Sequence, residues 1–152
     1  MPDSLFSLSA ASLTLVCLTL VTDAHAELGG TMPTSAVSHA AAPTASLNGA
    51  LRVRTFTDTG KTTINEYATS TGQIVAYTWQ GPTMPDLRAL LGNYADSFRA
   101  GAAALPADGN LHIARVARPD VIVETGGPMR SYVGRAWLPG ALPAGVTADD
   151  LR

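Results

Sequence analysis

The stretch YTWQGPTMPDLRALLG, residues 77–92, holds the end of one structural element and the start of the next. Pro82 cannot donate a hydrogen bond to a neighbouring strand, so we expect a strand to end just before it. Thr83 is the expected cap of a helix, with Pro85 in the first turn and Asp86 three residues after the cap. The Asp86 carboxylate would then lie at the positive end of the helix dipole. The stretch therefore predicts a β-strand that leads directly into an α-helix.

Three strand-like segments occupy the chain up to this corner. Residues 51–57, 62–68 and 73–80 alternate apolar and polar side chains, and the links between them, DTG and TSTG, are short and end in glycine, as in β-hairpins. The third segment carries apolar residues on both of its faces, which is typical of a central strand. These links predict an antiparallel meander.

A helix and three further strands are expected next. Gly92 and Gly101 lower the helix propensity by roughly 1 kcal/mol each relative to alanine, so either they allow close approach to the sheet or the helix breaks near Gly101. Residues 111–117, 120–125 and 129–138 are the expected strands, and the remainder is an irregular tail. The apolar stripe of the helix consists of Leu87, Leu90, Leu91, Tyr94, Phe98 and Leu105.

The predicted fold is therefore α+β. We expect an antiparallel sheet of about six short strands, in the order three strands, one helix, three strands, with the helix packed on one face. A small, partly open β-barrel with one helix is the alternative architecture. A single domain, residues 49–152, would contain all of these elements.

The amino-terminal residues predict export. Residues 1–26 combine an apolar run with AHA, whose small first and third residues fit a secretory signal peptide cleaved between Ala26 and Glu27. The apolar run is short and has no basic flank, which argues against the alternative of an uncleaved membrane anchor. Residues 27–48, rich in Ala, Ser, Thr and Pro, predict a flexible lead. We expect a periplasmic or secreted protein with no stable membrane insertion after cleavage.

The composition excludes several kinds of site. The only cysteine, Cys17, lies inside the signal peptide, so the mature chain has no disulfide, thiolate metal site or cysteine nucleophile. Its basic residues are scattered and equal the acidic ones in number, which argues against a nucleic-acid partner. His112 is the one histidine of the expected domain, too few for an ordinary zinc site. No phosphate loop, dinucleotide fingerprint or hydrolase motif occurs, so we expect no metal and no cofactor.

The corner between strand and helix is a candidate binding site. Trp79, Gln80, Asp86 and Arg88 would rim a concavity where the sheet meets the helix, and such a concavity suits a ligand. The same residues also have purely architectural roles, which is the alternative interpretation.

The carboxylates of the strands are the basis of a second hypothesis. Two of Glu66, Asp120 and Glu124 on one face would resemble the dyad of a glycosidase. Cross-strand pairing with arginines is the simpler interpretation. The hydrolase hypothesis fails if these carboxylates point apart or if each meets an arginine.

Residues 65–94, NEYATSTGQIVAYTWQGPTMPDLRALLGNY, contain EY, WQGP, PDLR and LLG, and LGG follows the expected cleavage site. With GGPMRSYVGRAWLP and LPAGVTADDL nearer the end, these motifs resemble a family of uncharacterised secreted bacterial proteins, domain of unknown function 2844. Residues 36–46 are more degenerate than the family pattern. The resemblance implies export and one compact domain, and it implies no activity and no catalytic residue.

Taken together, these features predict a non-catalytic periplasmic or secreted binding or accessory module. Its partner would be a protein or another component of the bacterial envelope. A small carboxylate-dependent hydrolase acting on envelope glycans is the alternative function.

Overall fold

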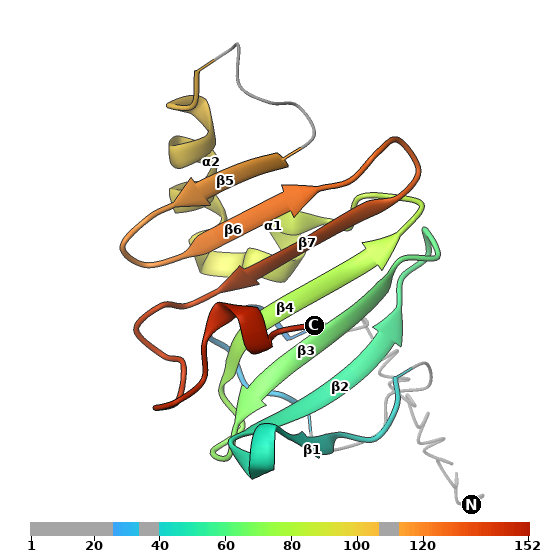
Figure 1. The fold of residues 1–152 in the computed structure, drawn as a ribbon, viewed down its shortest axis with the longest axis vertical. Coiled ribbons are helices and arrows are strands. Elements are labelled where there is room, and N and C mark those ends of the chain that lie inside the picture. The colour runs from blue at the N-terminus through green and yellow to red at the C-terminus, as the bar shows by residue number, and fades with distance from the viewer. Residues whose placement is uncertain (1–25, 34–39, 107–112) are drawn as a thin grey trace, which may run out of the picture.

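The computed structural model describes residues 26–33, 40–106 and 113–152. The predicted signal peptide up to residue 25 and His112 lie outside these residues. The described residues form one antiparallel sheet of seven strands in the order β1-β2-β3-β4-β7-β6-β5 (Figure 1). The strands are β1 (Thr44–Ser46), β2 (Leu51–Thr57), β3 (Thr63–Thr69), β4 (Ile74–Gly81), β5 (Ile113–Ala117), β6 (Ile122–Gly126) and β7 (Tyr132–Trp137).

One continuous helical run follows β4 and lies behind the sheet in Figure 1. It consists of α1 (Leu87–Leu91), the 3-10 turn η2 (Gly92–Tyr94) and α2 (Ala95–Ala103). Gly101 lies inside the helix, and a Cβ atom there would come within 2.5 Å of Val116 Cγ1. Of the two roles expected for this glycine, close approach to the sheet is therefore the observed one. The α+β prediction is confirmed, and the sheet is open rather than a closed barrel.

Strand β4 is the middle strand of the sheet, as its apolar faces predicted. The second meander returns so that its last strand, β7, pairs with β4, and this pairing joins the two halves of the fold. A register shift between Tyr67 and Ala68 of β3 changes the alternation at the start of β4. As a result Ile74 packs on the helix side, while Val75 and Ala76 both pack on the opposite side.

The two faces of the sheet are covered by different segments. The helical run and residues 26–32 cover one face, where Tyr77, Trp79 and Leu91 belong to the larger apolar core. The carboxy-terminal segment, residues 138–152, covers part of the other face with Leu151 against Tyr67. Its 3-10 turn η3 (Ala148–Asp150) lies in front of β4 in Figure 1, and η1 (Leu47–Gly49) precedes β2.

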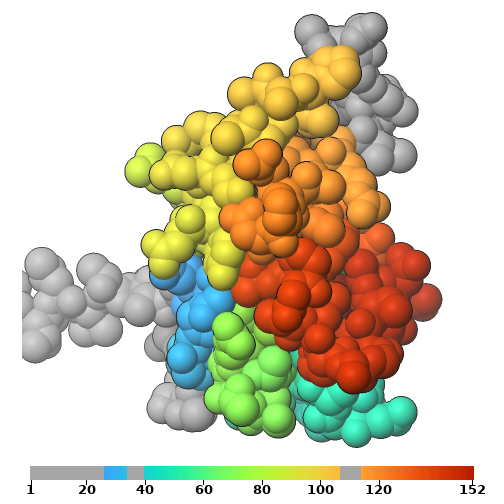
Figure 2. Space-filling view, turned by 90° about the vertical axis from the view of Figure 1, so that its left-hand side faces the viewer, coloured from blue at the N-terminus to red at the C-terminus, as the bar shows by residue number. Residues whose placement is uncertain are grey.

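The predicted flexible lead is wrong where the structure describes it. Leu28 and Met32 are 1% and 3% exposed and belong to the main core. Gly29 N–H donates to the Ile74 carbonyl over 2.8 Å, and Ile74 N–H donates back to the Gly30 carbonyl over 2.8 Å. Figure 2 shows this segment in blue, between the helical region in yellow and the β3–β4 turn in green. The domain therefore begins well before residue 49, because two large apolar side chains are enough to anchor a segment of low overall hydrophobicity.

The helix begins at Asp86 rather than at Thr83, which corrects the expected cap. The Asp86 carboxylate accepts hydrogen bonds from the N–H groups of Arg88 and Ala89 over 2.9 and 3.1 Å. The Thr83 hydroxyl is instead within hydrogen-bond distance of Thr62 and donates to the Gly60 carbonyl. A hydroxyl that already donates to a hairpin turn no longer faces the helix.

We expect Asp86→Ala to lower the free energy of unfolding by about 1 kcal/mol, because two helix N–H groups lose their acceptor. Asp96→Ala is the matched control, since Asp96 is exposed on α2 and pairs with the exposed Arg99. Asp96→Ala is expected to change the free energy of unfolding by no more than about 0.5 kcal/mol. Urea unfolding followed by tryptophan fluorescence measures both. Equal losses in the two variants would contradict the capping role.

Candidate functional site

A groove of about 700 Å³ lies on the sheet face opposite the helices, beside the carboxy-terminal segment. Its position follows from the length of that segment, which covers one end of this face and leaves the rest accessible. The lining residues are Thr63, Asn65, Thr78, Trp79, Gln80, Glu124, Thr125, Gly126, Gly127, Val133, Gly134, Arg135, Leu151 and Arg152.

The register of the sheet brings a row of polar side chains to the floor of the groove. Asn65 on β3 pairs with Thr78 on β4, Thr78 pairs with Arg135 on β7, and Arg135 pairs with Glu124 on β6. Paired residues project from the same face, so these four side chains lie in a line across the sheet. Asn65 Nδ2 donates to Thr78 Oγ1 over 3.2 Å and to the Arg152 carbonyl over 3.3 Å.

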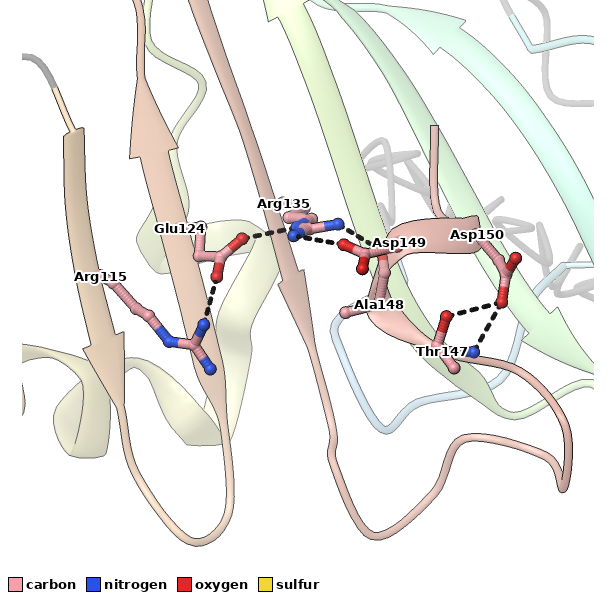
Figure 3. Close-up of polar contacts among 7 residues, drawn as sticks. All are labelled: Arg115, Glu124, Arg135, Thr147, Ala148, Asp149 and Asp150. Atoms are coloured by element: carbon pink, nitrogen blue, oxygen red, sulfur yellow. Dashed lines mark hydrogen bonds and ion pairs between the residues drawn. The ribbon is translucent and has the colours of Figure 1, made fainter.

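One end of this row is a chain of ion pairs, drawn in Figure 3. Arg115 Nη1 lies 2.8 Å from Glu124 Oε1, and Arg135 Nε lies 2.6 Å from Glu124 Oε2. Arg135 Nη2 continues the chain to Asp149 Oδ1 at 3.2 Å, and its Nη1 donates to the Ala148 carbonyl. The arginine therefore ties the carboxy-terminal segment to the sheet.

Glu124 and Asp149 stabilise the charged form of Arg135. Burial disfavours the charged form, but hydrogen bonds and attraction from Glu124 and Asp149 outweigh it and raise the pKa of Arg135. The guanidinium also lies 5.3 Å from the centre of the Trp137 ring. At this distance a cation gains from the electron-rich face of the ring.

A capping box closes the segment that borders the groove. The Asp150 carboxylate accepts from both the N–H and the hydroxyl of Thr147, each over 2.8 Å (Figure 3). The backbone N–H contributes most, and together these bonds lower the pKa of Asp150. These bonds stabilise the turn η3 internally, and the contacts of Arg135 hold the turn against the sheet.

The structure separates the residues of the predicted corner. Trp79 is only 3% exposed, and its ring packs across Gly134 on the helix side, while Gln80 is exposed on the opposite face. Asp86 caps the helix, and Arg88 is exposed on α1. Two of the four residues, Trp79 and Gln80, are part of the groove lining, so the corner and the groove overlap only there.

The strand carboxylates do not form a pair. Glu66 is buried on the helix face and meets Arg54 at 3.0 Å, whereas Glu124 lies on the other face between two arginines. Asp120 accepts from the Ser97 hydroxyl over 2.8 Å. Since the carboxylates point apart, the stated condition for the hydrolase hypothesis is not met. The expected pairing with arginines holds for Glu66, which meets Arg54, and for Glu124, which meets Arg115 and Arg135.

The sequence interpretation missed Asn65 and Arg135 as members of the candidate site. The available signal was the strict alternation within each strand, because Thr63 and Asn65 fall on one face of β3, as Thr78 and Gln80 do on β4. Nothing local to these strands shows that β7 supplies the next polar side chain.

The described residues contain neither a candidate metal centre nor a helix that could cross a membrane. No group of three or more His, Cys, Asp or Glu side chains there could hold a metal ion. In the same part of the chain, no helix has the length and apolar character needed to cross a membrane.

Comparison with protein families gives one match. A family model described as "Protein of unknown function (DUF2844)" matches residues 24–151, which is nearly the whole of the chain after the predicted signal peptide. No curated protein and no solved structure matches this chain. The match confirms the family resemblance drawn from the WQGP, PDLR and LLG motifs.

Proposed function

The chain belongs to the DUF2844 family of proteins of unknown function, and from this premise we propose that it is an exported, non-catalytic binding module. It acts in the periplasm or outside the cell, and its ligand site is the groove on the open face of the sheet. The observation that carries the proposal is the row of hydroxyl, amide and paired charged side chains on the groove floor.

The leader supports the export part of this proposal. An apolar run followed by AHA fits signal cleavage after Ala26. Fractionation tests this part directly. An exported protein is released from the periplasm with the mass of residues 27–152. An anchored accessory protein would remain with the membranes at full mass.

The absence of free acid–base groups on the described groove floor favours binding over catalysis. Glu124 is the only side-chain carboxylate among the described lining residues, and both of its oxygens meet guanidinium nitrogens, at 2.8 and 2.6 Å. A general acid needs a raised pKa and access to the reacting atom, whereas two cations beside a carboxylate favour its ionised form.

The chemistry of the lining points to a ligand rich in hydroxyl and amide groups. The exposed side chains of Thr63 and Gln80 offer uncharged donors and acceptors, while Arg135 and Glu124 neutralise each other. Val133 and three glycines add an apolar surface against which a ligand can lie. A strongly charged ligand would gain little here, so nucleic acid is not the expected partner. Glycan strands and extended peptides of the envelope both carry the expected chemistry.

The test uses ¹⁵N-labelled mature protein purified from the periplasm, titrated with muropeptide fragments in one arm and uncharged peptides in the other. Chemical-shift changes are expected at β3, β4 and β7 in one arm. Thr63→Ala and Gln80→Ala remove exposed groove groups, and each is expected to weaken binding about 2- to 12-fold, the effect of losing one hydrogen bond.

Arg88→Ala is the matched control, because Arg88 is exposed on α1 behind the sheet. It should leave the affinity unchanged. Shift changes confined to the α1 surface, or equal weakening in all three variants, would contradict the groove as the binding site.

A further inference from the structure

The carboxy-terminal segment is itself a stretch of peptide bound on the groove face of the sheet. It crosses the strands from β7 to β3. At β7, Arg135 donates to the Ala148 carbonyl, and at β3, Asn65 Nδ2 donates to the main-chain oxygen of Arg152 over 3.3 Å. Figure 1 shows the end of the chain in front of β3 and β4. The face therefore holds this segment at both ends through main-chain atoms.

Tyr67 of β3 completes the contact at Arg152. Its hydroxyl accepts from the Arg152 N–H over 3.0 Å and also donates to the main-chain oxygen of the same residue. Next to this contact the Leu151 side chain is 4% exposed and packs against Tyr67. Bonds to main-chain groups give affinity for a peptide of almost any sequence, and the side chains that pack beside them give specificity. The same kind of contact can therefore serve a second peptide.

A second row of side chains lies beside the polar row of the groove floor. Thr63 of β3 pairs with Gln80 of β4, Gln80 pairs with Val133 of β7, and Val133 pairs with Gly126 of β6. We call these four residues the outer row. Each lies two positions along its strand from a member of the polar row, so the two rows face the same way and lie roughly 7 Å apart.

The outer row is open where the polar row is in contact with the segment. Thr63 and Gln80 are exposed, and Val133 is 39% exposed. The amide of Gln80 carries both donors and an acceptor, and the hydroxyl of Thr63 can also do both. A peptide main chain needs partners of these two kinds, for its carbonyl and for its N–H. Val133 adds an apolar contact for one side chain.

We propose that the outer row binds an extended peptide, which crosses the sheet beside the carboxy-terminal segment and is held by its main chain. The inference rests on the proposed function, since it names the class of ligand that the groove takes. Gln80 Nε2 donates to a carbonyl of the peptide, and the Gln80 amide oxygen or the Thr63 hydroxyl accepts from an N–H. An apolar side chain of the peptide packs on Val133.

The width of the outer row sets the length of the peptide. Neighbouring strands lie about 4.8 Å apart, so the four strands from β3 to β6 span about 14 Å. An extended chain covers that distance with about four residues. A hexapeptide is therefore long enough to fill the row.

The lining favours a peptide over a glycan. Among the described residues that line the groove, Trp79 is the one aromatic residue, and its ring packs across Gly134 behind the sheet. A sugar ring therefore finds no exposed aromatic face to stack on in this part of the groove. A peptide main chain needs only the hydrogen-bonding groups that the same face already uses to hold Arg152.

The test replaces single amides of a peptide by esters. The probe is an uncharged, capped hexapeptide of serine and alanine with one leucine, and each analogue has one internal N–H replaced by an ester oxygen. An ester has no N–H to donate, so it reports on main-chain recognition. A tetrasaccharide of N-acetylglucosamine is the glycan probe. Each probe is titrated into the ¹⁵N-labelled mature protein, and the chemical-shift changes give the dissociation constants.

We expect the hexapeptide to change the shifts of the outer row, and at least one ester analogue to bind about 2- to 12-fold more weakly, the effect of one lost hydrogen bond. In Gln80→Ala or in Thr63→Ala, whichever residue accepts that N–H, the ester and the parent peptide should bind equally, because the two changes remove the same bond. Arg88→Ala, exposed on α1 behind the sheet, is the matched control and should keep the difference. The dispersion of the ¹⁵N spectrum verifies that each variant is folded.

The outcomes separate this inference from the proposed function. Equal binding of the parent peptide and all of its esters overturns the inference and leaves the groove as a binding site. An outer row that responds to the tetrasaccharide and not to the peptide does the same. So does an ester effect that is unchanged in both Gln80→Ala and Thr63→Ala. Shift changes outside the groove with both probes, or no changes with either, overturn the inference and the proposed function together.

Discussion

Replacing Glu66 by alanine is expected to lower the free energy of unfolding by about 3–5 kcal/mol. The change leaves the guanidinium of Arg54 buried, at 3% exposure, without its counter-charge. It also removes one of the two acceptors of the Tyr77 hydroxyl, the other being the Ala26 carbonyl. An unpaired buried charge is among the most destabilising single changes a small domain can suffer. Guanidinium unfolding followed by far-UV circular dichroism measures the loss.

Glu124→Ala is the control for this prediction. Glu124 also contacts arginines, but its side chain is 21% exposed, and water can replace part of the lost interaction. We expect a loss of about 1 kcal/mol or less. A double variant, Arg54→Met with Glu66→Leu, should recover most of the stability lost in Glu66→Ala, since apolar replacement of both partners is often neutral. Equal losses for Glu66→Ala and Glu124→Ala would contradict the assignment of the buried cluster.

Replacing Trp79 by alanine is the second large effect, expected at about 3–5 kcal/mol. The indole is buried between the sheet and the helical run and packs across Gly134, where a Cβ atom would lie 2.3 Å from the ring. Because Gly134 has no side chain to replace the ring, removal of the indole is expected to leave a cavity. The free energy of unfolding, measured by thermal and denaturant unfolding, reports the loss.

Gln80→Ala gives the sharpest comparison, because Gln80 is the next residue of the same strand. Its side chain is exposed on the opposite face, so its removal should change stability by no more than about 0.5 kcal/mol. For ligand binding we expect the opposite: Gln80→Ala has the larger effect, because Gln80 lines the groove and the Trp79 ring lies behind the sheet. A stable Trp79→Ala variant with lost binding would instead support the corner predicted from the sequence.

The helix cap shows why one detail of the fold was beyond the sequence. Both Thr83 and Asp86 can cap a helix, and their local sequence does not choose between them. Thr62 and Gly60 of the neighbouring hairpin decide between them, because both contact the Thr83 hydroxyl and leave Asp86 as the cap. A residue that contacts a distant turn cannot be assigned from its neighbours along the chain.

The packing of the amino-terminal segment could not be predicted from the sequence either. Its composition of small and polar residues predicted a flexible lead, and composition averages over residues 27–48. Leu28 and Met32 are exceptions within that average, and they are buried because the helix face of the sheet offers them a place. The motif LGG pointed to this segment, but only the packing explains it.

The sequence by itself determined the elements from β2 to β7 and their order, whereas β1 lies in the segment expected to be flexible. Alternating side chains, glycine-ended links and the proline after Gly81 act over a few residues, and they predicted the strands, the helix and the antiparallel meanders. The tertiary structure alone decided that β7 pairs with β4, which lines up Asn65, Thr78, Arg135 and Glu124 across the groove. It also brought Ala26 to Tyr77. These contacts join residues far apart in the chain, and their register depends on the whole core being packed at once.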